Sequence, residues 1–262
     1  MVNPLAAKGQ LQPEVPAVSV QRHEIGEAFS DLARQVWIPR WKLPDGVVVT
    51  QPVLQYPALN VAVEADAAAV HLPVGGVGTR DLAGAGWAAG LLLRPGAGSL
   101  IVPGDMSTML GSVVPIPNGC RLIETLRELM GTHADSADIV TAYEHWLGGL
   151  LHLVDEEVRL VNAITDAAEH DVGIRTPRDL REQFSMSERA MQRLLKRRVG
   201  FSPRWLIQRR RLQEAALQIR ERPDMALADI AADLGYADQA HFNRDFGAVI
   251  AMTPGDYRRS LP

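Results

Sequence analysis

The sequence predicts an α+β fold: a β-rich N-terminal domain followed by helices, and then an all-α C-terminal domain in which a long helix joins two helix-turn-helix units. Up to residue 103, short apolar stretches of strand length alternate with glycine and proline. From Asp105 onward, the apolar residues recur at helical spacing. After residue 175, two successive helix pairs carry capping residues.

These changes of pattern divide the chain of 262 residues into four parts. We expect a mobile, proline-rich segment at 1–18, a β-rich and helical domain at 19–152, a linking helix at 153–173 and the all-α domain at 174–262. The stretches VVVTQPVLQ, ALNVAVE, AAVHLPV, AAGLLLRP and SLIVP are predicted strands, and GGVGTRDLAGAG a hairpin or turn-rich loop. Helices are expected in DMSTMLGS, RLIETLRELMG and the region 136–170.

The first helix pair begins at Thr176, which can cap a helix whose first residue is Pro177. Ser187 can cap the second helix, which ends near Gly200. One face of this second helix is apolar, and the opposite face carries the polar and cationic residues Arg189, Gln192, Arg193, Lys196 and Arg197. Arginine and glutamine can make paired hydrogen bonds to base edges, so this face has the chemistry of a DNA recognition helix. A solvated charged face is the alternative.

A helix of about 19 residues follows from Pro203 and ends before Pro223. Its length of roughly 29 Å is close to the roughly 34 Å rise of one DNA turn, so helices held at its ends would suit successive major grooves. In the second pair, Gly235 allows the turn and Asp238 can cap the next helix. That helix presents Gln239, Ala240, His241, Asn243 and Arg244. His241 is equally compatible with an ordinary exposed histidine.

The stretches DLREQFSMSERAMQRLLKRRVGFSP and LADIAADLGYADQAHFNRDFGAVIAMTPGDYRR resemble the AraC/XylS-type transcriptional regulators. The resemblance implies that Arg189, Gln192 and Arg193 read bases from the first unit, and the positions of Ala240 and Arg244 from the second. This chain has Gly247 where the family usually has lysine, and Ala251 where it usually has glycine. Since alanine cannot hydrogen-bond a base edge, we expect the second unit to grip DNA more than it reads it.

Charge is distributed unevenly along the chain. Residues 174–262 carry 17 Lys and Arg against 11 Asp and Glu, a net charge of +6, whereas residues 1–173 carry 10 against 20, a net charge of −10. Together these give the net charge of −4 for the whole chain. A cationic domain attracts DNA by releasing counterions, so DNA contact is expected at the C-terminal domain alone.

The segments IPRWKLPDG, QPVLQYPALNVAVE and GTRDLAGAGWAAGLLLRPGA are similar to a poorly characterised N-terminal domain that often precedes AraC-type modules. The resemblance implies effector binding, dimerisation or both. An aromatic pocket with cationic anchors for an anionic ligand is one interpretation, built from Trp37, Trp41, Tyr56, Arg80, Trp87 and Arg94. Core packing of the aromatic side chains and surface placement of the arginines is the other.

Several function classes find no support in the residues. There is no apolar run of 18 residues and only one cysteine, Cys120, so we expect a cytoplasmic protein without a membrane span or an intrachain disulfide. His145 and His152 have no third ligand at metal spacing, and no catalytic motif is present, so we expect no metal, no cofactor and no catalytic site.

Two functions remain. The first is a sequence-specific DNA-binding regulator, with double-stranded promoter DNA as its partner, RNA polymerase and a small-molecule effector as further candidate partners, and homodimerisation as a candidate assembly. The second is an enzyme or metabolite-processing domain fused to a DNA-binding module.

Overall fold

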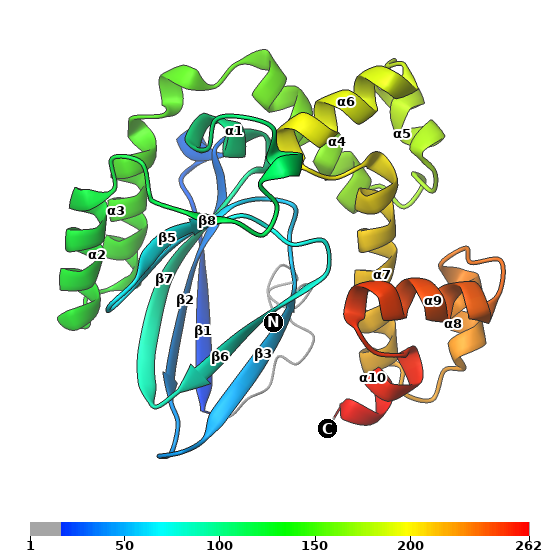
Figure 1. Ribbon diagram of the computed structural model, residues 1–262, viewed down its shortest axis with the longest axis horizontal. Helices are drawn as coiled ribbons and strands as arrows, with labels where there is room; N and C mark the ends of the chain where they lie inside the picture. The colour runs from blue at the N-terminus through cyan, green and yellow to red at the C-terminus, as the bar shows by residue number, and fades with distance from the viewer. Residues whose placement is uncertain (1–16, 262) are drawn as a thin grey trace.

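The computed structural model describes residues 17–261, so most of the predicted mobile segment lies outside it. Two sheets make up the N-terminal domain (Figure 1). The larger sheet has six antiparallel strands in the order β1-β2-β7-β4-β5-β8, and the smaller sheet pairs β3 with β6. The strands are β1 (Val18–Glu24), β2 (Ala33–Lys42), β3 (Val48–Leu54), β4 (Asn60–Glu64), β5 (Ala68–His71), β6 (Val77–Ala83), β7 (Ala85–Leu93) and β8 (Val113–Val114).

Helices α2 (Cys120–Gly131) and α3 (Ser136–Gly148) pack side by side on one face of the larger sheet (Figure 1). Alternation along β2 explains the contact, because Val36 and Ile38 are fully buried on the face toward the helices. The hydroxyl of Tyr143 in α3 donates a 2.7 Å hydrogen bond to the main-chain oxygen of Ala89 in β7. This contact satisfies a polar group in an otherwise apolar core.

Two sequence expectations in this domain are wrong. The glycine-rich stretch does not form a hairpin, because β6 pairs with β3 while β7 enters the larger sheet, and the chain changes sheets at Gly84, whose φ is 56°. The stretch SLIVP is not a strand but contains the short helix α1 (Gly98–Ile101). Pro95 begins a helical turn directly before α1, and burial of Ile101 in the core holds it there. Residues 105–112 form only one helical turn, at Met106–Thr108.

The C-terminal half contains the expected tandem arrangement. Helices α5 (Pro177–Gln183) and α6 (Glu188–Val199) form the first unit, α7 (Pro203–Glu221) is the long helix, and α8 (Leu227–Asp233), α9 (Gln239–Ile250) and α10 (Pro254–Ser260) form the second. In Figure 1, α7 runs between the two units and contacts both. The predicted caps Thr176, Ser187 and Asp238 are confirmed, since each accepts a hydrogen bond from a main-chain N–H of its helix. Ser202 caps α7 in the same way.

Helix α4 (Glu156–His170) corresponds to the expected linking helix, and it is more than a connection. Its side chains Val161, Ile164 and Ala168 belong to the apolar cluster that forms the core of the first helix-turn-helix unit. On another side, α4 packs against the turn at Pro95–Ala97 of the N-terminal domain, where Asn162 accepts a hydrogen bond from the N–H of Gly96. The helix is therefore shared between the two halves of the chain.

Within residues 17–261, no helix combines the length and the apolar character needed to cross a membrane.

Candidate nucleic-acid interface

Helix α6 separates its residues into a buried face and an exposed face, as its spacing predicts. Met191, Leu194, Leu195 and Val199 are buried in the core of the first unit. The five predicted contact residues are all exposed: Arg189, Gln192, Arg193, Lys196 and Arg197. The helix is held at both ends, by Ser187 and by Gly200, which closes it with a φ of 89°. A short rigid rod with a polar, cationic face is the geometry that a major groove admits.

The arginines of α6 differ in their partners. Arg189 and Arg193 form no hydrogen bond or ion pair with any other residue in the range 17–261. Arg197, in contrast, lies 2.7 Å from the carboxylate of Glu157 in α4, and the same carboxylate binds Arg198. The side chains of Arg189 and Arg193 are therefore available to an external acceptor, whereas the guanidinium of Arg197 is already paired with Glu157.

Helix α9 offers a weaker reading face. Gln239, Ala240 and Arg244 are exposed, whereas His241 and Asn243 are half-buried. The ring of His241 lies 3.5 Å from the carboxylate of Asp245 and edge-on to Tyr236. Of the three exposed positions, Arg244 alone carries a charge. The sequence prediction of one reading unit and one gripping unit thus fits the exposed chemistry, and base contact itself remains a prediction.

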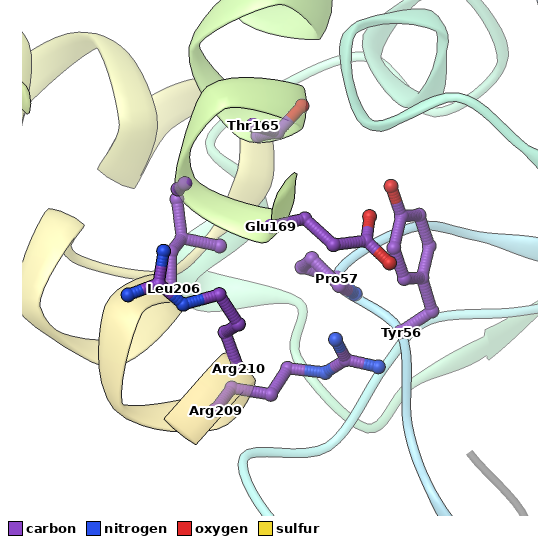
Figure 2. Close-up of a pocket in the computed structure, with 8 residues that line it drawn as sticks. Tyr56, Pro57, Thr165, Glu169, Leu206, Arg209 and Arg210 are labelled. Carbon is purple, nitrogen blue, oxygen red and sulfur yellow. The ribbon is translucent and has the colours of Figure 1, made fainter. Parts of the chain in front are cut away.

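A buried polar cluster joins the N-terminal domain to α4 and α7 (Figure 2). The Tyr56 ring lies between two guanidinium groups, that of Arg34 at 4.4 Å and that of Arg209 at 5.2 Å from the ring centroid. Arg34 also donates a 2.7 Å hydrogen bond to Glu169 in α4. Arg209 donates through Nε to the main-chain oxygen of Gln55. Three elements are thereby linked through one tyrosine.

Burial governs the electrostatics of this cluster. Desolvation lowers the pKa of Arg209 to about 10, which leaves the guanidinium charged at neutral pH. Desolvation also raises the pKa of the Tyr56 hydroxyl, so the phenol stays neutral. Burial alone would raise the pKa of Glu169, but the adjacent charge and hydrogen bond of Arg34 outweigh it and lower that pKa. The charged groups of the junction are thus stabilised mainly by one another, because burial removes most of their hydration.

The six residues proposed as a ligand pocket do not line one cavity. Trp87 packs into the core beneath the helices, whereas the indole groups of Trp37 and Trp41 lie over Gly90 and Gly86 and donate to Asn60 and to the oxygen of Ala83. Arg80 pairs with Glu64, and Arg94 pairs with Asp166. Only Tyr56 lines the small cavity of about 10 Å³ at the domain junction, which has room for about one water molecule.

Sequence reasoning missed the junction residues Arg34, Glu169 and Arg209. The run of three arginines at 209–211 contained a signal, because three successive positions point in different directions around a helix, so a packed helix cannot keep all three in solvent. Asp166, Glu169 and His170 also gather within metal-ligand reach of one another. Both carboxylates in that group already pair with arginine, so their negative charge is compensated without an ion.

Comparison with known proteins agrees with this geometry. Residues 180–260 match the family model described as a helix-turn-helix domain. The regulator MtrA of Neisseria gonorrhoeae is 33% identical over 75 residues, which are 29% of this chain and 25% of that protein. A protein of Streptomyces lividans described as an AraC-like transcription regulator is 31% identical over 118 residues, which are 45% of this chain and 37% of that protein. This chain thus spans about a quarter to just over a third of these relatives, which are transcriptional regulators.

Among solved structures, ToxT of Vibrio cholerae superposes on 93% of this chain and 97% of its own chain, with 12% sequence identity and a TM-score of 0.42. The matched region of the family model covers α6, α7, α8, α9 and α10 entirely and the second half of α5. This match identifies residues 180–260 as a helix-turn-helix domain, and part of the chain is similar in sequence to an AraC-like transcription regulator.

Proposed function

We propose that this protein is a sequence-specific DNA-binding regulator of transcription, which contacts successive major grooves of promoter DNA with α6 and α9. The single observation that supports this most strongly is α6 itself: a capped helix, buried on one face, that presents the unpaired Arg189 and Arg193 on the other. Bidentate arginine contacts to guanine are the commonest specific base contact, so α6 is the main reader in this proposal. Because promoter DNA is the partner in this proposal, we expect the protein to act in the cytoplasm.

The N-terminal domain has the regulatory role in this proposal. It holds α4 and α7 through the buried cluster around Tyr56, so a change in its structure would reach both helix-turn-helix units. A small-molecule effector or dimerisation would supply that change. RNA polymerase is a further partner if the bound protein activates transcription.

Selection of bound duplexes from a random library with the full-length chain supplies the test. We expect an enriched sequence motif, and mobility-shift affinities for it that fall steeply with salt. The double variant Arg189→Ala/Arg193→Ala should lose most of the discrimination between this motif and random DNA. Arg121→Ala is the matched control, because Arg121 is an exposed arginine on α2 in the N-terminal domain. Absence of any enriched motif, or equal discrimination by the double variant, would contradict the proposal.

A further inference from the structure

One edge of the N-terminal domain contacts both helix-turn-helix units. The end of β3 lies beside the beginning of β6, with Leu54 opposite Val77, and the chain just before β6 faces α7. In the first of these contacts, the indole Nε1 of Trp205 donates a 3.1 Å hydrogen bond to the main-chain oxygen of Gly75. Trp205 is in the first turn of α7, and its ring stacks on Phe201 at 3.7 Å, directly after the first unit. This contact therefore fixes the end of α7 that belongs to the reading unit.

The next two residues reach the second unit. Val77 packs against the apolar cluster formed by α7, α8, α9 and α10. A Cβ atom at Gly76 would lie 3.3 Å from the main-chain oxygen of Val249, close to the end of α9. Glycine at this position allows the backbone to approach α9 more closely than most side chains would permit. The segment 75–77 thus contacts the beginning of α7 and the end of α9 within three residues.

Gln55 connects this segment to the middle of α7. Its side-chain Oε1 accepts a 3.0 Å hydrogen bond from the N–H of Val74, and its main-chain oxygen accepts from Arg209. Arg209 is buried, and its guanidinium has a second acceptor in Gln213 at 2.8 Å. We name Gln55 together with residues 74–77 the seat. The seat contacts α7 at two points and α9 at one.

This arrangement bears on how the two recognition helices are placed relative to each other. The long helix α7 fixes the distance between the units, but the second unit is attached to it mainly through apolar packing. The seat lies outside both units, and its contacts with α7 and α9 restrict movements of the second unit that α7 alone would permit. On DNA, a change of one base pair between two contacted sites moves one site by about 3.4 Å and turns it by about a tenth of a helical turn. A small displacement of α9 relative to α6 therefore changes which spacing fits.

We propose that the seat sets the relative position of α6 and α9 and thereby determines the number of base pairs that the protein accepts between its two contacted DNA sites. Trp205, Gly76 and Gln55 are positioning residues in this sense, because they act through the two helices and touch no base. The proposal rests on the proposed function for its DNA consequence. Its structural part stands without DNA.

The structural part is tested by a distance measurement in the free protein. Spin labels are attached at Glu188 on α6 and Ala248 on α9, both exposed, in a full-length Cys120→Ser background, because Cys120 is exposed and would also be labelled. Gly76→Val should broaden or shift the distance distribution, since its side chain must displace the end of α9. Thr79→Val is the matched control, because it places a valine at an exposed position of β6, three residues after Gly76. An unchanged distribution in Gly76→Val would overturn the proposal.

Trp205→Phe provides a milder variant should Gly76→Val fail to fold. It removes the indole N–H that binds Gly75 and keeps an aromatic ring to stack on Phe201. The distance distribution should broaden with this variant as well. A folded Trp205→Phe protein with the wild-type distribution would contradict the proposal independently.

The DNA part uses duplexes in which the two selected sites are separated by zero to three additional base pairs. We expect the wild-type and Thr79→Val proteins to prefer one spacing by about ten-fold, and the Gly76→Val and Trp205→Phe proteins to bind all spacings within about three-fold. Binding to a duplex with only the site of the first unit should be the same for all four. If the seat variants keep the wild-type spacing preference, the proposal is wrong. If no protein binds any duplex while the label distances still change, the proposed function fails and the structural role of the seat stands.

Discussion

Ala251 closes α9 with a backbone φ of 63°, in the left-handed region that glycine adopts without strain. The AraC/XylS-type resemblance implies glycine at this position, and the backbone conformation is one that favours glycine. Because a Cβ atom is disfavoured there, Ala251→Gly should raise the free energy of unfolding by about 0.5 to 1 kcal/mol. Urea denaturation measures the change, with Ala248→Gly as control. Ala248 lies in the interior of the same helix, so its replacement should lower stability by about 1 kcal/mol.

Glu169 gives the domain junction a predictable pH dependence. Its pKa in the folded chain is lowered, because the charge of Arg34 outweighs the effect of burial. A carboxyl group of this kind stabilises the fold fully above its unfolded pKa of about 4.3, and the contribution is lost as pH falls through the folded pKa. Glu169→Gln should therefore lower the free energy of unfolding by about 3 kcal/mol at pH 7. The difference from the wild-type protein should shrink below about pH 4, as followed by thermal denaturation across pH.

A stability difference that does not change with pH would show that another group causes it. If the wild-type and Glu169→Gln proteins differed equally at pH 7 and pH 3, the ion pair of Arg34 with Glu169 would not be the source of the stability.

At the scale of elements, α6 and α9 differ in what they expose, and their variants should differ accordingly. Arg193→Ala removes an unpaired arginine from α6, so it should cost about 1 to 3 kcal/mol of binding free energy and relax base preference at one position. Arg244→Ala removes the one exposed charge of α9 among Gln239, Ala240 and Arg244, so it should weaken binding to all sequences equally. Competition binding with base-substituted duplexes measures both. An equal loss of discrimination in both variants would refute the asymmetry.

The helical elements were predictable because their signals are local. A capping residue such as Ser187 and a glycine such as Gly200 mark where α6 begins and ends, and the apolar spacing between them defines its buried face. The strands were harder, since pairing across the sheet is not local. The change of sheet at Gly84 depends on which partners β3 and β7 find, and no pattern near Gly84 specifies that.

The candidate site likewise has one part that the sequence predicts and one part that it does not. The exposed face of α6 follows from helix periodicity alone. The junction around Tyr56 requires Arg34 to meet Glu169 and Arg209, which lie more than a hundred residues later in the chain, and only the fold brings them together. The aromatic pocket was one of two interpretations of these residues, and the arrangement of the strands favours packing instead. Trp87 faces the helices, whereas Trp37 and Trp41 do not.

At the scale of the whole molecule, opposite charge on the two halves of the chain coexists with an extensive contact between them. The basic C-terminal part is held to the acidic N-terminal part through α4, whose carboxylates Glu157, Asp166 and Glu169 pair with arginines from both sides. Charge alone would place a boundary at residue 174, whereas packing places one face of α4 in the core of the helices that follow it. The unit that binds DNA in our proposal therefore begins before its basic residues do.

This boundary leads to a prediction about fragments of the chain. A fragment of residues 174–262 lacks Val161, Ile164 and Ala168, so it loses the α4 side of the apolar core that supports α6. Exposing a core of this kind costs several kcal/mol, which is a large share of the stability of a small domain. We expect the fragment 174–262 to melt without a cooperative transition in its first unit, and the fragment 155–262, which keeps Asp155 as the cap of α4, to unfold cooperatively. Circular dichroism melting of both fragments, with Ile164→Ala in the longer fragment as an intermediate, measures the contribution of α4. Equal cooperativity in the two fragments would show instead that the second unit and α7 suffice to hold α6 in place.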